Sequence, residues 1–153
     1  GNFDPKLLKT VKNNLNSERK PFNFTIVGND ISRSALKTAK ANAKRAKVDE
    51  YIEFINSDFF DLKHELDSGV IIMNPPYGER LKSQDENQFY QKIGDTLKQN
   101  FNNFDAWVLS SNKEALKHLG LRTSRRLLLF NGALECKYHN YSLYKGSRKR
   151  KYE

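Results

Sequence analysis

The sequence predicts an α/β fold in which an open, mostly parallel sheet ends in an antiparallel C-terminal hairpin. Up to about residue 119, short apolar segments typical of strands alternate with segments whose apolar residues recur at helical spacing. Beyond that point, two strand-like segments follow each other directly across Asn131-Gly132, a pair that favours a tight turn with positive φ.

Two helices and two strands are expected in the first part of the chain. Asp4-Pro5 begins a helix, because a carboxylate caps the first turn and proline suits its first position. A strand over residues 24–27 ends in Gly28-Asn29-Asp30. Ser32 then caps a helix with a narrow apolar stripe at positions 36, 39, 43 and 46, and a second strand covers residues 51–55.

The second part of the chain repeats the alternation before the hairpin. Residues 70–73 are apolar on both faces, which is typical of a buried parallel strand. A polar loop over residues 78–87 precedes a helix with apolar residues at 89, 93, 97 and 101. A strand over 106–110, a short helix over 113–119 and the hairpin strands 126–130 and 133–144 complete the order.

The composition describes one globular domain with an excess of positive charge. Hydrophobic residues make up 37% of the 153 residues, and Lys+Arg 27 against Asp+Glu 18 gives a net charge of +9. Such an excess suits a polyanionic partner, most commonly nucleic acid, although a soluble basic protein shows the same charge. We expect residues 1–144 to form this domain and residues 145–153 a basic tail.

Cysteine and histidine usage gives no sign of a disulfide or a metal site. Cys136 is the only cysteine and is interpreted as a small apolar residue in a strand, which indicates a reducing, cytoplasmic location. His64, His118 and His139 lack metal-ligand spacing and are interpreted as structural or surface residues. No apolar segment approaches the length of a membrane span, so no membrane partner is expected.

Polar residues follow three successive strands of the predicted sheet, and open α/β sheets bind ligands beyond these carboxyl ends. The residues are Asp30, Asp58 and Asn74. An acid at such a position commonly accepts hydrogen bonds from ribose hydroxyls, and Asp58 could accept one from an adenine amino group. Helix capping explains either aspartate equally well, so both interpretations remain open.

The third strand end is more specific, because Asn74, Pro75, Pro76 and Tyr77 fit a clamp for an exocyclic amino group. Such a nitrogen is a poor nucleophile until acceptors hold its two N–H bonds, and the Asn74 side chain and the Pro75 carbonyl could be those acceptors. Proline supplies a rigid turn without a backbone donor, and Tyr77 offers a stacking face. The alternative is that these four residues only form a rigid turn after a strand.

Four segments carry a resemblance to a known family, namely IVGNDISRSALKTAKANAKRAKV, INSDFFDL, VIIMNPPYGERL and LLLFNGALECKYHNYSLY. Together they span nearly the whole chain. They resemble the class I S-adenosylmethionine-dependent methyltransferases that act on exocyclic amines. The resemblance is closest to the bacterial 23S ribosomal RNA guanine-N2 methyltransferases, which are also labelled N6-adenine-specific methylases. It implies a Rossmann-like sheet and methyl transfer to an amino group of a base in RNA.

The resemblance also implies roles for individual residues. Asp30 resembles the acid that binds the ribose of S-adenosylmethionine, and Ile31 the apolar contact to its adenine. Asp58 resembles the residue that reads the adenine amino group, with Phe59 adjacent to it. Residues 74–77 resemble the clamp for the target base, and 23S ribosomal RNA is the implied partner. No metal is implied.

One departure from the family pattern concerns the first strand and its glycine-rich loop, of the type CGSGT, which has no counterpart before Asp30. We therefore expect this sequence to be the C-terminal piece of a larger enzyme and to be inactive alone. Without this strand, its two neighbours in the sheet would lie about 10 Å apart. A companion N-terminal segment or a second copy would supply the missing strand. An adenine-N6 methyltransferase on DNA or RNA, or a non-catalytic RNA-binding piece, remains an alternative.

Overall fold

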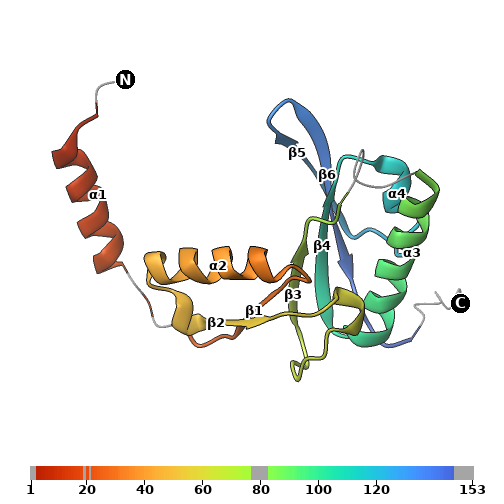
Figure 1. Cartoon of the computed structure of the whole chain (residues 1–153). Helices are drawn as coiled ribbons and strands as arrows, with labels where there is room; N and C mark the ends of the chain where they lie inside the picture. Colours follow the sequence, from red (N-terminus) through yellow and green to blue (C-terminus); the bar gives the residue numbers. More distant parts are fainter. Residues whose placement is uncertain (1–2, 19, 21, 77–82, 147–153) are drawn as a thin grey trace, which may run out of the picture. The chain divides into compact units, whose positions relative to one another are not determined.

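Helices and strands alternate along the chain as the sequence predicts, and they group into two units, Gly1–Leu62 and Lys63–Glu153. The computed structural model describes residues 3–18, 20, 22–76 and 83–146 (Figure 1). Tyr77 and most of the predicted basic tail therefore lie outside the described residues. Among the described helices, none has both the length and the apolar character that a bilayer crossing requires.

The first unit begins with an amphipathic helix, α1 (Pro5–Ser17). The Asp4 carboxylate caps it, as predicted, because Oδ1 accepts from the backbone N–H groups of Lys6 at 2.8 Å and Leu7 at 3.3 Å. No residue of α1 is buried, and its apolar positions remain exposed. The helix therefore presents an apolar stripe that no described element covers.

A two-stranded parallel sheet forms the rest of this unit, with β1 (Ile26–Asn29) beside β2 (Ile52–Ile55). Helix α2 (Arg33–Ala46) and the 3₁₀ turn η1 (Asp49–Tyr51) connect them, and a second 3₁₀ turn, η2 (Phe59–Asp61), follows β2. The first strand was predicted to begin at residue 24. It begins two residues later because the exposed Phe24 ring packs edge-to-face on Phe22 instead of joining the ladder.

The second unit contains a four-stranded sheet in the order β3-β4-β6-β5. Strands β3 (Gly69–Met73) and β4 (Phe104–Ser110) are parallel, and β6 (Leu134–Ser142) is antiparallel to both β4 and β5 (Arg125–Asn131). The predicted hairpin is confirmed, and Gly132 takes the positive φ of its turn at 63°. This gives the mixed sheet that the sequence predicts.

The interpretation of β3 as a strand buried on both faces was wrong. It is an edge strand, and the side chains of Val70 and Ile72 are 64% and 73% exposed. Both residues point to the same face, since side chains alternate along a strand. Within the described residues, β3 pairs with β4 alone, so one row of its backbone hydrogen-bonding groups has no strand beside it.

Two helices cover the opposite face of this sheet, α3 (Ser83–Asn100) and α4 (Lys113–Lys117) (Figure 1). The predicted loop over residues 78–87 was too long, because Asp85 and Glu86 lie in the first turn of α3, where acidic residues favour a helix. The core lies between α3 and the sheet; its largest fully buried side chains include Tyr90, Ile93, Leu97 and Val108.

Candidate functional site

Side-chain amides tie together the loops that follow β1 and β2. The Asn29 amide nitrogen donates toward three acceptors, Ile55 O at 3.2 Å, Ser57 O at 3.0 Å and Ser57 Oγ at 2.9 Å. The Asn56 amide donates in the opposite direction, to Asp30 O at 3.0 Å and Ile31 O at 2.9 Å. The roles of both asparagines were not predicted, although an asparagine one or two residues before each aspartate was the available signal.

These ties hold the two predicted aspartates at the same edge of the β1–β2 sheet. Asp30 is exposed, and its Oδ1 accepts from the backbone N–H of Ser32 at 2.7 Å. Asp58 is half-buried, and its Oδ1 caps η2 by accepting from Phe60 N at 3.0 Å. The capping interpretation is therefore correct for Asp58, whereas Ser32 caps α2 and Asp30 only binds the backbone N–H of that cap residue. Within the described part of the chain, the second oxygen of each accepts no hydrogen bond.

The two apolar residues assigned beside these acids differ in exposure. The Ile31 side chain is 69% exposed, whereas Phe59 is half-buried and forms an edge-to-face pair with Phe60. The edge thus combines two carboxylate oxygens with apolar surface. This combination suits a ligand that has both hydroxyl or amino donors and a flat ring.

The predicted clamp begins where β3 ends in the second unit. Met73 is the last residue of β3 and pairs with Val108 of β4. Asn74 directly after it is exposed, and its side chain forms no hydrogen bond with another described residue. Pro75 is buried and Pro76 is half-buried, so the turn after Asn74 is held by packing. The stacking role predicted for Tyr77 falls outside the described residues.

A buried hydrogen-bonded network supports the neighbouring end of β4. The Tyr90 hydroxyl donates to Ser110 Oγ at 2.8 Å, which also accepts from Asn112 N at 3.1 Å. The Asn112 amide donates to Glu86 Oε2 at 3.0 Å. Glu86 is 3% exposed, and its Oε1 is a buried acceptor without a hydrogen-bond partner among the described residues. The network ties α3 to the segment that follows β4. Glu86 was missed because the sequence predicted a loop at this position.

The predicted site residues thus fall into two groups that the structure describes separately. The residues assigned to the cofactor lie in the first unit, where β1 and β2 bring them together. The described clamp residues lie in the second unit at the end of β3. Each group occupies the carboxyl end of parallel strands, where ligands bind in open α/β sheets.

The hairpin face that packs toward α4 carries a second group of polar residues. His139 lies opposite Arg126 across β6 and β5, and its Nδ1 lies 3.3 Å from the Tyr141 hydroxyl. Burial, and then the positive charges of Arg126 and Lys137, hold the pKa of His139 below its ordinary value. Burial likewise raises the pKa of Tyr141. Cys136 is buried in the same strand, which confirms its interpretation as an apolar residue.

The lowered pKa of His139 predicts a loss of stability on the acid side. As the pH falls below about 6.5, the unfolded chain binds a proton at this histidine that the folded chain resists. The free energy of unfolding should therefore decrease between about pH 7.5 and 5.5, measured as the urea midpoint from Trp107 fluorescence. His139→Gln should flatten this dependence, whereas the exposed His118→Gln should leave it in place. An unchanged slope in His139→Gln would contradict the assignment.

Comparison with known proteins identifies relatives of this sequence. Residues 2–140 match the family model described as an RMKL-like methyltransferase domain. The Synechocystis sp. protein named "Putative RNA methyltransferase slr0064" is 39% identical over 139 residues, covering 90% of this chain and 35% of the relative. Ribosomal RNA large subunit methyltransferase K/L of Shewanella frigidimarina is 40% identical over 124 residues, covering 80% of this chain and 17% of the relative.

Solved structures show the same fold. The structure titled "The crystal structure of a possible methylase from Clostridium difficile 630" superposes with a TM-score of 0.78 at 33% identity, covering 96% of this chain and 39% of the other. The α/β architecture is therefore that of the Rossmann-like methyltransferases, as predicted. The chain spans only about a third and a sixth of the lengths of the two curated relatives.

Proposed function

Because the chain belongs to the family of RMKL-like methyltransferase domains, we propose that it takes part in methyl transfer from S-adenosylmethionine to an exocyclic amino group of a base in RNA. The base is guanine, methylated at N2 in 23S ribosomal RNA. The observation that carries the proposal is Asn74 at the end of β3, exposed and without a hydrogen-bond partner in the described residues, followed by a buried proline. Relatives named as RNA methyltransferases support the substrate class.

The residues after β3 orient the target amino group. The Asn74 side-chain oxygen and the Pro75 carbonyl accept its two N–H bonds, which holds the nitrogen lone pair toward the donor. Both prolines lack a backbone N–H, so no donor in the turn competes for these acceptors. The cofactor supplies an activated methyl group on a sulfonium. As the nitrogen–carbon bond forms and the carbon–sulfur bond breaks, the nitrogen becomes acidic and releases a proton to water.

The edge of the β1–β2 sheet holds the cofactor. The free oxygen of Asp30 accepts from ribose hydroxyls, and that of Asp58 accepts from the adenine amino group. Ile31 and Phe59 contact the adenine ring. Carboxylates suit these donors because charge-assisted hydrogen bonds are about twice as strong as neutral ones.

A further strand completes the sheet beside β3. The exposed side chains of Val70 and Ile72 and the unpaired backbone edge of β3 fit a strand from a companion N-terminal segment or from a second copy. Burying the parts of these two side chains that are still exposed stabilises such a pairing by about 2–4 kcal/mol before its ordering cost. The chain alone is accordingly inactive.

Methylation of adenine N6 is the second candidate, because the Asn74 clamp accepts either amino group and does not distinguish the two bases. The other alternative is a chain that contributes only RNA binding. Guanine is preferred because the sequence motifs resemble those of guanine-N2 methyltransferases, and the relatives named as ribosomal RNA methyltransferases support ribosomal RNA as the substrate. The modified nucleoside itself discriminates between the two bases.

The test is transfer of labelled methyl groups from S-adenosylmethionine to unmethylated ribosomal RNA. The chain alone should give little or no transfer, and the chain joined to a preceding segment with a glycine-rich loop should be active. Digestion of the product should yield N2-methylguanosine. N6-methyladenosine would overturn the guanine assignment, and no transfer by any completed form would overturn the methyltransferase proposal.

A further inference from the structure

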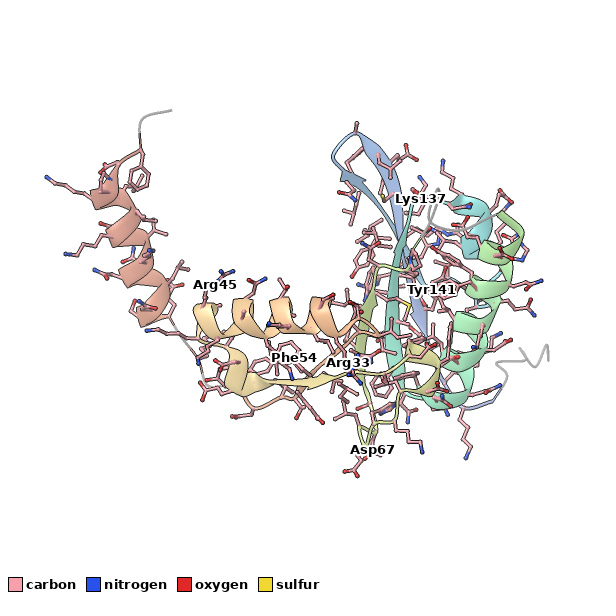
Figure 2. The ribbon with its side chains drawn as sticks, in the orientation of Figure 1. Arg33, Arg45, Phe54, Asp67, Lys137 and Tyr141 are labelled. Carbon is pink, nitrogen blue, oxygen red and sulfur yellow. The ribbon has the colours of Figure 1, made fainter. Side chains whose placement is uncertain are left out.

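The β5–β6 hairpin and α4 line an open surface cavity of about 540 Å³ that the proposed chemistry does not use. Cationic side chains from α4, β5 and β6 border it, at Lys113, Lys117, Arg126 and Lys137, together with His139. Leu116, Leu128 and Tyr141 are among the other lining residues. The cavity thus pairs a cationic lining with an apolar wall. Figure 2 labels Lys137 and Tyr141, which both belong to β6.

The charges around the cavity are not balanced. Glu135 forms salt bridges with two lysines, since its Oε1 lies 3.0 Å from Lys137 Nζ and 3.2 Å from Lys113 Nζ. Glu114 pairs with Lys117 at 2.7 Å. Arg126 forms no salt bridge in the part of the chain that the structure describes. Four cations therefore share two carboxylates. Burial is the main cause of the lowered pKa of His139, and the positive charges of Arg126 and Lys137 lower it further.

The register of the sheet places this cavity in line with the proposed clamp. Arg126 pairs with His139, His139 with Val108, and Val108 with Met73, the residue before Asn74. Lys137 pairs with Ser110 at the carboxyl end of β4. Three strand spacings separate the backbones of Met73 and Arg126, about 14 Å. Nucleotides adjacent to an extruded base can cover this separation along the sheet.

We propose that this cavity, which we call the hairpin cavity, binds a phosphodiester of the RNA strand beside the target nucleotide. Arg126 and Lys137 contact the phosphate oxygens, and the apolar wall takes the attached sugar. An arginine without a carboxylate partner suits phosphate, because its planar fork matches two phosphate oxygens. The inference deepens the proposed function and rests on it, since it assumes that RNA is the substrate.

The test measures RNA affinity, which does not require catalysis. The double variant Arg126→Gln/Lys137→Gln should bind a short single-stranded RNA about tenfold more weakly by fluorescence anisotropy, because it cannot form charge-assisted hydrogen bonds to the phosphate. The slope of log affinity against log salt should fall by about 0.7 for each phosphate that the protein no longer neutralises. The matched control is Arg125→Gln/Lys37→Gln. This control removes the same amount of positive charge, at Arg125 on the opposite face of β5 and at Lys37 in α2. It should retain most of the RNA affinity and of its salt dependence.

A second measurement needs no substitution and therefore does not depend on the folding of a variant. In the unchanged chain, bound RNA should raise the pKa of His139, followed through its imidazole NMR signal, while His64 and His118 serve as internal references. Inorganic phosphate and guanosine monophosphate, added separately, distinguish an RNA site from a site for free phosphate. We expect both to bind more weakly than the RNA.

Three results would overturn the inference. These are equal reductions of affinity in the double variant and its control, an unmoved His139 signal at saturating RNA, or binding of inorganic phosphate as tight as that of RNA. Failure of the proposed function would give a different result. The chain joined to the preceding segment would then transfer no methyl group, while its RNA binding would still depend on Arg126 and Lys137.

Discussion

Asn74→Ala should lower kcat for methyl transfer by about 100- to 1000-fold in a preparation that also contains the proposed further strand beside β3. Reductions of this size follow the removal of one positioned hydrogen-bonding group from a reacting centre. Asn74 is exposed at the end of β3, and β4 and the buried Pro75 fix its backbone. Alanine keeps this backbone and removes only the acceptor. RNA affinity should change little, since phosphate contacts supply most of it.

Two further substitutions make this result specific. Asn74→Asp retains an acceptor oxygen and should keep more activity than alanine, whereas Asn100→Ala removes an exposed asparagine side chain at the end of α3 and should leave kcat unchanged. The measurement is single-turnover transfer of labelled methyl groups at saturating RNA. Equal rates for Asn74→Ala and the unchanged protein would contradict the clamp.

Gly94→Ala should destabilise the second unit by about 3 kcal/mol, a large part of a typical domain's stability. A Cβ at this position of α3 would lie 1.9 Å from the carbonyl oxygen of Leu119 and 2.6 Å from its carbonyl carbon. Both are backbone atoms of a fully buried residue, so no side-chain rotation relieves the clash. The α3 helix or the segment after α4 must move, which separates layers of the core.

The urea midpoint measures this effect through Trp107, the only tryptophan in the chain, which lies in β4. Intrinsic helix propensity acts in the opposite direction, because alanine favours a helix by about 1 kcal/mol over glycine. Gln99→Ala, at an exposed position of the same helix, is the control and should keep the midpoint. A midpoint raised by Gly94→Ala would show that the two segments do not approach as described.

Local signals predicted most of the fold. Asp4 and Ser32 cap the helices that they were expected to cap, and Gly132 makes the hairpin turn, because each acts within a few residues of itself. The failures have a non-local cause. An apolar run such as residues 70–73 shows that both faces of a strand suit burial, but not which elements supply the covering surface.

For the candidate site, the structure bears on the positions of the residues and not on their roles. The acids and Asn74 follow strands as expected, since strand ends are readable from the sequence. Asn29, Asn56 and Glu86 were missed because their partners lie 25 or more residues away, so only the folded chain shows the pairs. The positions relative to a bound cofactor stay predictions, as does the role of Tyr77.

The reciprocal amide bonds of Asn29 and Asn56 make the two sides of the proposed cofactor site move as one body. Cofactor binding then requires little additional ordering of these two loops. Their conformational entropy is lost when the chain folds and not when the cofactor binds. A substitution at Asn56 should therefore shift Asp30. The Asn56 amide binds the backbone carbonyl of Asp30, not the carboxylate that the ligand would use. We therefore expect the affinity for the proposed cofactor to depend partly on Asn29 and Asn56, although their amides would not contact it.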